Sequence, residues 1–328
     1  MPELDLLDHA WWEITGRCQL ACRHCYASSG PDKAHGTMTV SDWYRVITQT
    51  RAAGATMGQF IGGEPTLHPA LPQLVRHALD MGMEVEIYTN LVHVTPVMWE
   101  TFRLPGVRLA TSYYSDQADE HRAITKRPSL RATTRNIARA REFGIPLRAG
   151  VINVLHRQRI DQATAVLERL GVSDIGHDDL REVGRGIRER RGIRESGSGV
   201  DQLCGNCGDR QVAISPTGEV WPCVFARWLP AGDVHRSSLP AILVSETFGQ
   251  IMSDLRRKFG ERPACSPNKP CRPDPCSPDC SPSCRPQHNC RPTNNCAPNY
   301  GCGPCAPKDQ NCNPVRNCKP NKCRPTEK

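Results

Sequence analysis

The chain has 328 residues, of which 38% are hydrophobic and 23% charged, enough for one large or two smaller globular domains. The formal net charge is +8, but residues 261–328 carry eleven Lys and Arg against five Asp and Glu, which leaves +2 for the residues before them. A nearly neutral globular part argues against a nucleic-acid partner. No apolar run reaches the ~18–20 residues that span a bilayer, so we expect no membrane segment.

The cysteines and the amino terminus together predict a cytoplasmic, metal-binding protein. The first 18 residues, MPELDLLDHAWWEITGRC, contain neither the basic region nor the apolar run of a signal peptide. Of the 18 cysteines, three lie within the first 25 residues, three between Cys204 and Cys223, and twelve between Cys265 and Cys323. In a reducing compartment such clusters bind metal more often than they form disulfides.

Short apolar runs alternate with stretches of helical periodicity through the first 180 residues. The predicted strands are His9–Ile14, Met57–Ile61, Glu84–Tyr88, Arg108–Ser112, Leu147–Asn153 and Val172–Ile175. The predicted helices are Val40–Ala53, Ala70–Met81, Pro96–Arg103, Ser129–Phe143 and Ile160–Leu170. Strand–helix alternation predicts an α/β fold with a parallel sheet. Six units predict a partial (β/α)6 TIM-like barrel, with functional residues at the C-terminal ends of its strands.

A connection, a hairpin and a helix are predicted after the barrel. Asp178–Val200 is charged and glycine-rich, Gln211–Ala226 has a turn at Pro216–Gly218, and Ile242–Phe259 has helical periodicity. Beyond Pro263 there is no Ile or Leu, so the tail cannot bury a conventional core. We therefore divide the chain into a barrel core (1–195), a small C-terminal extension (196–262) and a Cys/Pro-rich tail (263–328).

Cys18, Cys22 and Cys25 follow the first predicted strand with the spacing CxxxCxxC. Three thiolates can hold one face of a cubane iron–sulfur cluster and leave its fourth iron free to bind substrate, whereas four-cysteine clusters mainly transfer electrons. A structural zinc site is the alternative, with His24 or His35 as a further ligand.

Cys18, Cys22 and Cys25, followed by Tyr26, resemble the signature loop of the radical S-adenosylmethionine (SAM) superfamily. The resemblance implies a [4Fe–4S] cluster whose open iron chelates the amino and carboxylate groups of SAM. It also implies reductive cleavage of SAM to a 5′-deoxyadenosyl radical, which abstracts hydrogen from a substrate. The electron would come from a donor such as flavodoxin or ferredoxin.

Further motifs resemble those with which this superfamily binds SAM. Gly62-Gly63-Glu64-Pro65 is similar to its GGEP motif, in which glycines admit close backbone approach and a carboxylate can pair with the methionine ammonium. Thr89-Asn90 resembles the usual TNG, with Leu91 in place of glycine. The resemblance implies two more SAM-binding candidates at strand ends, Ser112 and Asn153.

Cys204-x2-Cys207-x10-Gly218-x4-Cys223 forms a second group, and the hairpin turn would return Cys223 to the CxxC pair. The spacing is similar to the opening half of the SPASM/twitch extension of radical SAM peptide maturases, which implies at least one auxiliary iron–sulfur cluster. A small zinc knuckle is the alternative. The fourth ligand of this site is not assigned. The alternatives are Cys265, a later cysteine, substrate and solvent.

The tail repeats Cys-x-Pro, and its nearest match to the second half of the SPASM motif is Cys302-x2-Cys305-x6-Cys312-x5-Cys318. We favour partial use of the tail in auxiliary cluster ligation. Binding of other soft metals, a basic docking arm, and a peptide substrate held in cis are the alternatives.

The resemblance favours an oxidoreductase-type maturase that modifies a ribosomally synthesised peptide. A radical SAM enzyme acting on a small metabolite, and a non-catalytic iron–sulfur or zinc protein, are the alternatives. No catalytic acid or base is assigned. His121 lies near the predicted substrate end of the barrel, but a lone histidine is more often structural or solvated. Arg185 follows the last predicted strand, where contact with a carboxylate and a solvated loop position are equal alternatives.

Overall fold

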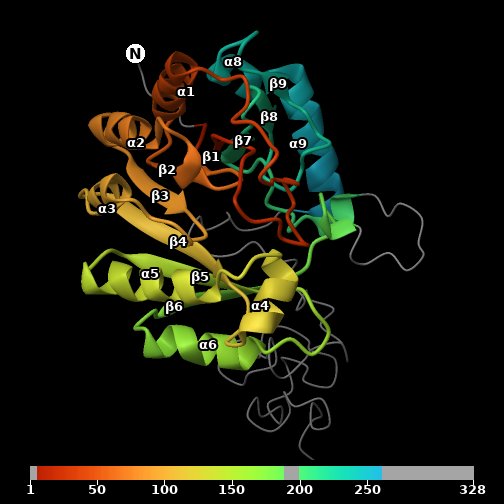
Figure 1. The fold of residues 1–328 in the computed structure, drawn as a ribbon. Helices are drawn as coiled ribbons and strands as arrows, with labels where there is room; N and C mark the ends of the chain where they lie inside the picture. Colours follow the sequence, from red (N-terminus) through yellow and green to blue (C-terminus); the bar gives the residue numbers. More distant parts are fainter. Residues whose placement is uncertain (1–5, 188–198, 261–328) are drawn as a thin grey trace, which may run out of the picture. The chain divides into compact units, whose positions relative to one another are not determined.

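The computed structural model describes residues 6–187 and 199–260 (Figure 1). The strands are β1 (His9–Glu13), β2 (Met57–Ile61), β3 (Glu84–Tyr88), β4 (Val107–Tyr113), β5 (Leu147–Asn153), β6 (Asp174–Asp179), β7 (Gln211–Ile214), β8 (Glu219–Trp221) and β9 (Gly232–Asp233). The helices are α1 (Val40–Ala52), α2 (Leu71–Asp80), α3 (Pro96–Phe102), α4 (Ala118–Thr125), α5 (Leu130–Glu142), α6 (Ile160–Arg169), α8 (Leu239–Leu243) and α9 (Glu246–Phe259). The predicted tail, with Cys265 and all later cysteines, lies outside the described residues.

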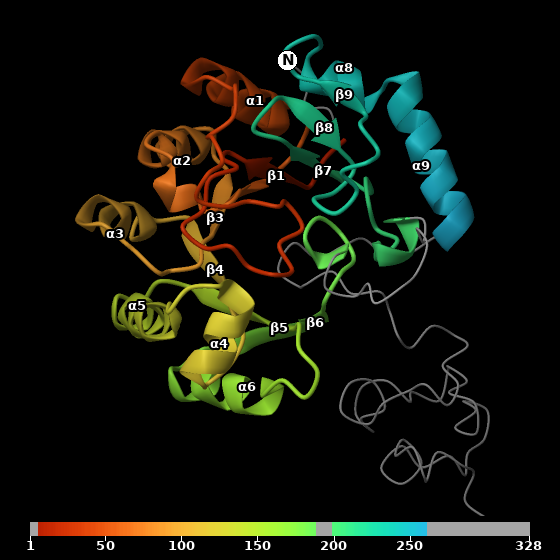
Figure 2. The ribbon, with the colours of Figure 1, turned by 45° about the vertical axis from the view of Figure 1, so that its right-hand side comes forward.

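The strands form one sheet in the order β6-β5-β4-β3-β2-β1-β7-β8-β9. Neighbouring strands from β6 to β1 are parallel, and helices α1, α2, α3, α5 and α6 line one side of this curved sheet in both Figure 1 and Figure 2. The predicted partial α/β barrel is therefore confirmed. None of the helices in the described residues is long and apolar enough to cross a bilayer.

The hairpin after the barrel continues the same sheet. Strand β7 pairs in parallel with β1, with His9 opposite Gln211, and β8 and β9 then add antiparallel strands. All four residues of β7 are buried. A short segment that is buried on both faces can be recognised as a strand from its sequence. Its pairing partner cannot, because that partner lies about 200 residues earlier in the chain.

Two predicted elements are wrong in their bounds. The last barrel strand runs over Asp174–Asp179 instead of Val172–Ile175, because this strand of sequence DIGHDD is paired on one side only and carries polar side chains. The predicted helix Ile242–Phe259 is two helices. The break comes at Ser245, whose hydroxyl accepts a 3.2 Å hydrogen bond from the Phe248 N–H and so starts α9. Helix α4, whose sequence is ADEHRAIT, was not predicted at all.

Candidate active site

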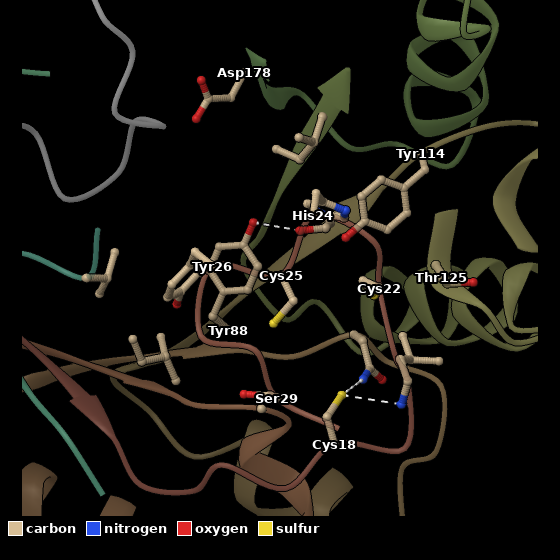
Figure 3. Close-up of a pocket in the computed structure, with 18 of the residues that line it drawn as sticks. Cys18, Cys22, His24, Cys25, Tyr26, Ser29, Tyr88, Tyr114, Thr125 and Asp178 are labelled. Atoms are coloured by element: carbon tan, nitrogen blue, oxygen red, sulfur yellow. Dashed lines mark hydrogen bonds between the residues drawn. The ribbon is translucent and has the colours of Figure 1, made fainter. Parts of the chain in front are cut away.

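A cavity of about 260 Å³ opens at the C-terminal ends of the barrel strands (Figure 3). Seven predicted site residues line it: Cys18, Cys22, Cys25, Gly62, Gly63, Asn90 and Ser112. Three other predicted SAM-binding residues do not line it, namely Glu64, Pro65 and Asn153, and neither do Cys204, Cys207 and Cys223 of the second cysteine group. Residues more than 90 positions apart in the sequence therefore meet in one place, as the parallel barrel requires.

The loop of Cys18, Cys22 and Cys25, which we call the cluster loop, is tied to the end of α4. The Ala21 N–H donates to the Thr125 carbonyl at 3.2 Å, and the Arg23 N–H to the Ile124 carbonyl at 2.9 Å. Figure 2 shows the red loop beside α4. The end of helix α4 thus holds the cluster loop through two backbone hydrogen bonds.

The cluster-loop sulfurs lie in surroundings that suit thiolates bound to iron. The Cys18 sulfur accepts from the Leu20 N–H at 3.4 Å and from the Asn90 amide at 3.7 Å. Burial raises the pKa of Cys18 to about 12 and also raises the pKa of Cys22. Such thiols ionise when a cation binds them, so the residues present fit a metal cluster.

Among the residues that the structure describes, no three His, Cys, Asp or Glu side chains converge closely enough to hold a single metal ion. A cubane places each cysteine on a different iron, so its ligands need not meet at one point.

Gly62 and Gly63 bring strand β2 against the backbone of the cluster loop. The Gly63 N–H donates to the Thr15 carbonyl at 2.6 Å. A Cβ on Gly63 would lie 2.5 Å from the Arg17 carbonyl carbon, and one on Gly62, where φ is +152°, would collide with the Thr15 carbonyl oxygen. Because neither glycine has a Cβ, the backbone of the cluster loop can pack directly against them. Both glycines also line the cavity.

Glu64 is buried, does not line the cavity, and accepts hydrogen bonds from donors of the protein. Its Oε1 accepts from the Thr66 N–H and hydroxyl and from the Thr89 hydroxyl, and its Oε2 accepts from the Asn90 N–H at 2.8 Å. Burial raises the pKa of this carboxyl group, and the four hydrogen bonds oppose that rise. Each carboxylate oxygen offers about two acceptor sites, and Oε2 uses one of them, so about one remains on Oε2.

Three further polar residues are placed as follows. Asn90 and Gln19 exchange side-chain amide hydrogen bonds of 3.0 and 3.1 Å. The Ser112 hydroxyl lies 3.0 Å from the Tyr88 hydroxyl, inside the cavity lining. Asn153 does not line the cavity, but its side-chain amide donates a 2.9 Å hydrogen bond to Asp179, which does.

Most of the cavity wall farther from Cys18 was not predicted from the sequence. Tyr88, Tyr114 and Phe225 supply aromatic surface together with Tyr26 of the signature loop, and Asp178 stands at the opposite end from Cys18 (Figure 3). Because Tyr88 ends β3 and Tyr114 directly follows β4, their position at the C-terminal ends of the strands was the available signal. Phe225 comes from the segment after β8, which no local pattern places here.

His121 and Arg185, left unassigned from sequence, both line the cavity. His121 Nε2 lies 3.0 Å from the Ser129 hydroxyl, and burial lowers its pKa to about 4. The Arg185 guanidinium donates to the carbonyl of Cys22 at 2.7 Å.

Cys204, Cys207 and Cys223 form a second buried thiol group. The sulfurs of Cys207 and Cys223 are 2.9 Å apart, and contact with Cys204 raises the pKa of Cys207. The turn between β7 and β8, with Gly218 at φ +93°, returns Cys223 to the pair as the spacing predicted. The candidate fourth ligand Cys265 lies outside the described residues.

Two family descriptions match this chain. The radical SAM superfamily matches residues 12–170, and the SPASM iron–sulfur cluster-binding domain matches residues 175–281. The second match begins at the second residue of β6, and the two matches together span both cysteine groups.

Named relatives share part of their length with this chain. A protein of Streptomyces rochei named PqqA peptide cyclase is 29% identical over 188 residues, which cover 55% of this chain and 50% of that protein. A protein of Methanosarcina barkeri (strain Fusaro) named Fe-coproporphyrin III synthase is 26% identical over 201 residues, which cover 58% and 49%. The chain thus spans about half the length of these relatives.

Streptococcus suis SuiB, solved bound to its precursor peptide SuiA, has a similar structure. The TM-score is 0.62 at 14% identity, and the match covers 76% of this chain and 67% of SuiB. At this identity the likeness shows a common fold.

Proposed function

This chain belongs to the radical SAM superfamily and carries a SPASM domain, and we propose that it is an enzyme that uses SAM to modify a peptide. The observation that carries the proposal is the cavity in which the three cluster-loop cysteines meet Gly62, Gly63 and Asn90. Because the chain spans about half the length of its named relatives, its activity and substrate are part of this proposal.

The radical SAM domain implies a [4Fe–4S] cluster and SAM, and the SPASM domain implies auxiliary iron–sulfur clusters. When bound, these cofactors supply reductive cleavage of SAM and a 5′-deoxyadenosyl radical that takes a hydrogen atom from the substrate. Cys18, Cys22 and Cys25 would hold the SAM-binding cluster. The N–H groups of Leu20 and Asn90 face the Cys18 sulfur and stabilise its negative charge.

Polar groups in the cavity lining are suited to hold SAM. We assign this role to the backbone of Gly62 and Gly63 and to the side chains of Asn90 and Ser112. Glu64 remains the proposed partner of the methionine ammonium, through its one free acceptor site. Pro65 and Asn153 complete the proposed SAM-binding residues, with Pro65 opening the short 3-10 helix that Glu64 caps.

The auxiliary cluster is assigned to Cys204, Cys207 and Cys223, which are buried together. We propose Cys265 or a later tail cysteine as its fourth ligand. The domain boundaries at residues 195 and 262 also stand as a proposal.

The peptide substrate is supported by the name of the Streptomyces rochei relative and by the SPASM match. The aromatic wall of Tyr26, Tyr88, Tyr114 and Phe225 would exclude water from a reactive radical. The Methanosarcina barkeri relative, named as a porphyrin synthase, keeps a small metabolite as the second candidate substrate.

The electron donor is proposed to be a small acidic protein such as flavodoxin or ferredoxin. Lys126 and Arg127 are exposed and directly follow Thr125, whose carbonyl holds the cluster loop. Opposite charges would steer such a donor to this side of the loop. Iron–sulfur chemistry and free thiols favour a reducing compartment, so we propose that the protein acts in the cytoplasm.

The proposal is tested with anaerobically reconstituted full-length protein, SAM, dithionite and candidate peptides encoded beside its gene. We expect 5′-deoxyadenosine and a changed peptide mass. The triple Cys18/Cys22/Cys25→Ala variant should release no 5′-deoxyadenosine, whereas a Cys207→Ala variant should lose auxiliary iron and keep SAM cleavage. Wild-type protein that binds iron but never cleaves SAM would disprove the radical function. SAM cleavage with porphyrins and not with peptides would support the second candidate.

A further inference from the structure

Three arginines of the described residues line the cavity, and two of them are neutralised by carboxylates. Arg148 donates to both oxygens of the buried Glu86 at 2.8 and 2.7 Å. Arg181 bonds to Asp178 at about 3.1 Å and stacks on Phe225, with its guanidinium carbon 4.6 Å from the ring centre.

Arg185 differs from both. In the described part of the chain no carboxylate pairs with it, and its guanidinium instead donates to the Cys22 carbonyl at 2.7 Å. Its backbone N–H donates to the Cys25 carbonyl at 3.0 Å. One residue therefore holds the carbonyls of two cluster-loop cysteines and keeps its positive charge beside them.

The backbone around Arg185 is shaped for this contact. Gly184 has φ +59°, and a Cβ there would lie 2.5 Å from the Cys25 carbonyl oxygen. The Gly186 N–H donates back to the Val183 carbonyl at 3.0 Å, which closes the turn. The turn that follows β6 thus packs directly on the cluster loop, and a side chain at position 184 would push it away.

We propose that Arg185 is a positioning residue that holds the cluster loop and raises the reduction potential of the cluster bound there. This inference rests on the proposed function. The cluster accepts one electron from an external one-electron donor, with no other bond made or broken, and its negative charge increases by one. A fixed cation close by stabilises the reduced form more than the oxidised form. Net charge and neighbouring hydrogen-bond donors are known determinants of iron–sulfur potentials.

The test compares Arg185→Gln, which removes the charge, with Arg185→Lys, which keeps it, in the reconstituted full-length protein. Arg141→Gln, which removes an exposed arginine near the end of α5, is the control for charge loss elsewhere. The readouts are iron content and the midpoint potential of the signal that SAM perturbs, from a redox titration followed by electron paramagnetic resonance.

We expect a more negative midpoint potential in Arg185→Gln, a near wild-type value in Arg185→Lys, and no shift in Arg141→Gln. An unchanged potential in a fully loaded Arg185→Gln variant would overturn the inference. Loss of the cluster from both Arg185 variants would overturn it as well, because the residue would then act only as a structural clamp. A wild-type protein with no SAM-sensitive cluster signal would instead refute the proposed function.

Discussion

The carboxylate of Glu64 accepts a 2.8 Å hydrogen bond from the backbone N–H of Asn90, which joins the turn after β2 to the end of β3. The side-chain amide of the same Asn90 reaches the Cys18 sulfur at 3.7 Å. Two sequence motifs that were recognised separately are therefore parts of one hydrogen-bonded support under the cluster loop.

Replacing Glu64 by Gln should destabilise the protein. The amide N–H2 of glutamine would replace one carboxylate oxygen and leave either the Asn90 N–H or the Thr66 and Thr89 donors without an acceptor. A buried donor without an acceptor costs about 1–3 kcal/mol. Urea denaturation measures the free energy of unfolding.

Glu84→Gln is the matched control, because the Glu84 side chain is 70% exposed. It should change the free energy of unfolding little. Equal stability of the Glu64→Gln variant and wild type would show that the Glu64 hydrogen bonds contribute nothing net.

Gly63→Ala should displace the cluster loop. The added methyl group meets the Arg17 backbone, which cannot move aside as a flexible side chain could. We expect less iron after reconstitution and little cleavage of SAM. Iron analysis and 5′-deoxyadenosine release measure the two effects.

Gly30→Ala is the control within the same region, because a Cβ there meets nothing within 4 Å. It should keep normal iron content. Full iron loading of Gly63→Ala would contradict the close packing of β2 on the cluster loop.

Leu91→Gly separates backbone strain from packing. Leu91 has φ +54°, a conformation that favours glycine, but its side chain is fully buried. Glycine would relieve about 1–2 kcal/mol of strain, whereas truncating a buried leucine costs about 2–5 kcal/mol. We therefore expect lower stability by urea denaturation.

Lys126→Gly provides the opposite case, because Lys126 has φ +63° and is exposed. Strain is relieved there with no packing lost, so stability should stay level or rise by about 1 kcal/mol. A stabilised Leu91→Gly variant would show that strain outweighs packing at that site.

His121 should make the protein less stable in mild acid. Burial lowers its pKa from 6.5 to about 4, so between these pH values the unfolded state binds more protons than the folded state. Stability present above pH 6.5 is then lost as the pH falls towards 4, by up to roughly 3 kcal/mol from this residue. Urea denaturation at several pH values measures the slope.

His121→Gln should flatten that slope, and substitution of the exposed His93 by Gln should not. His9 and His68 have pKa values lowered by burial to about 3 and about 4, so some slope remains in every variant. Identical slopes for wild type and His121→Gln would contradict a buried, neutral His121.

Local patterns were enough to predict much of this protein. Short runs rich in apolar residues, such as Met57–Ile61, mark strands because burial on both faces demands them. The spacing of Cys18, Cys22 and Cys25 and the GGEP residues also lie within short segments, so they could be recognised before any contact was known.

Contacts between distant segments could be identified only in the three-dimensional structure. The parallel pairing of β7 with β1 and the hydrogen bond between Arg185 and Cys22, 163 residues apart, leave no local trace in the sequence. The burial of Glu64 under Asn90 likewise depends on how β2 and β3 lie side by side. The reason is physical: periodicity and spacing report what one segment needs, whereas pairing and charge placement depend on which segments the barrel brings together.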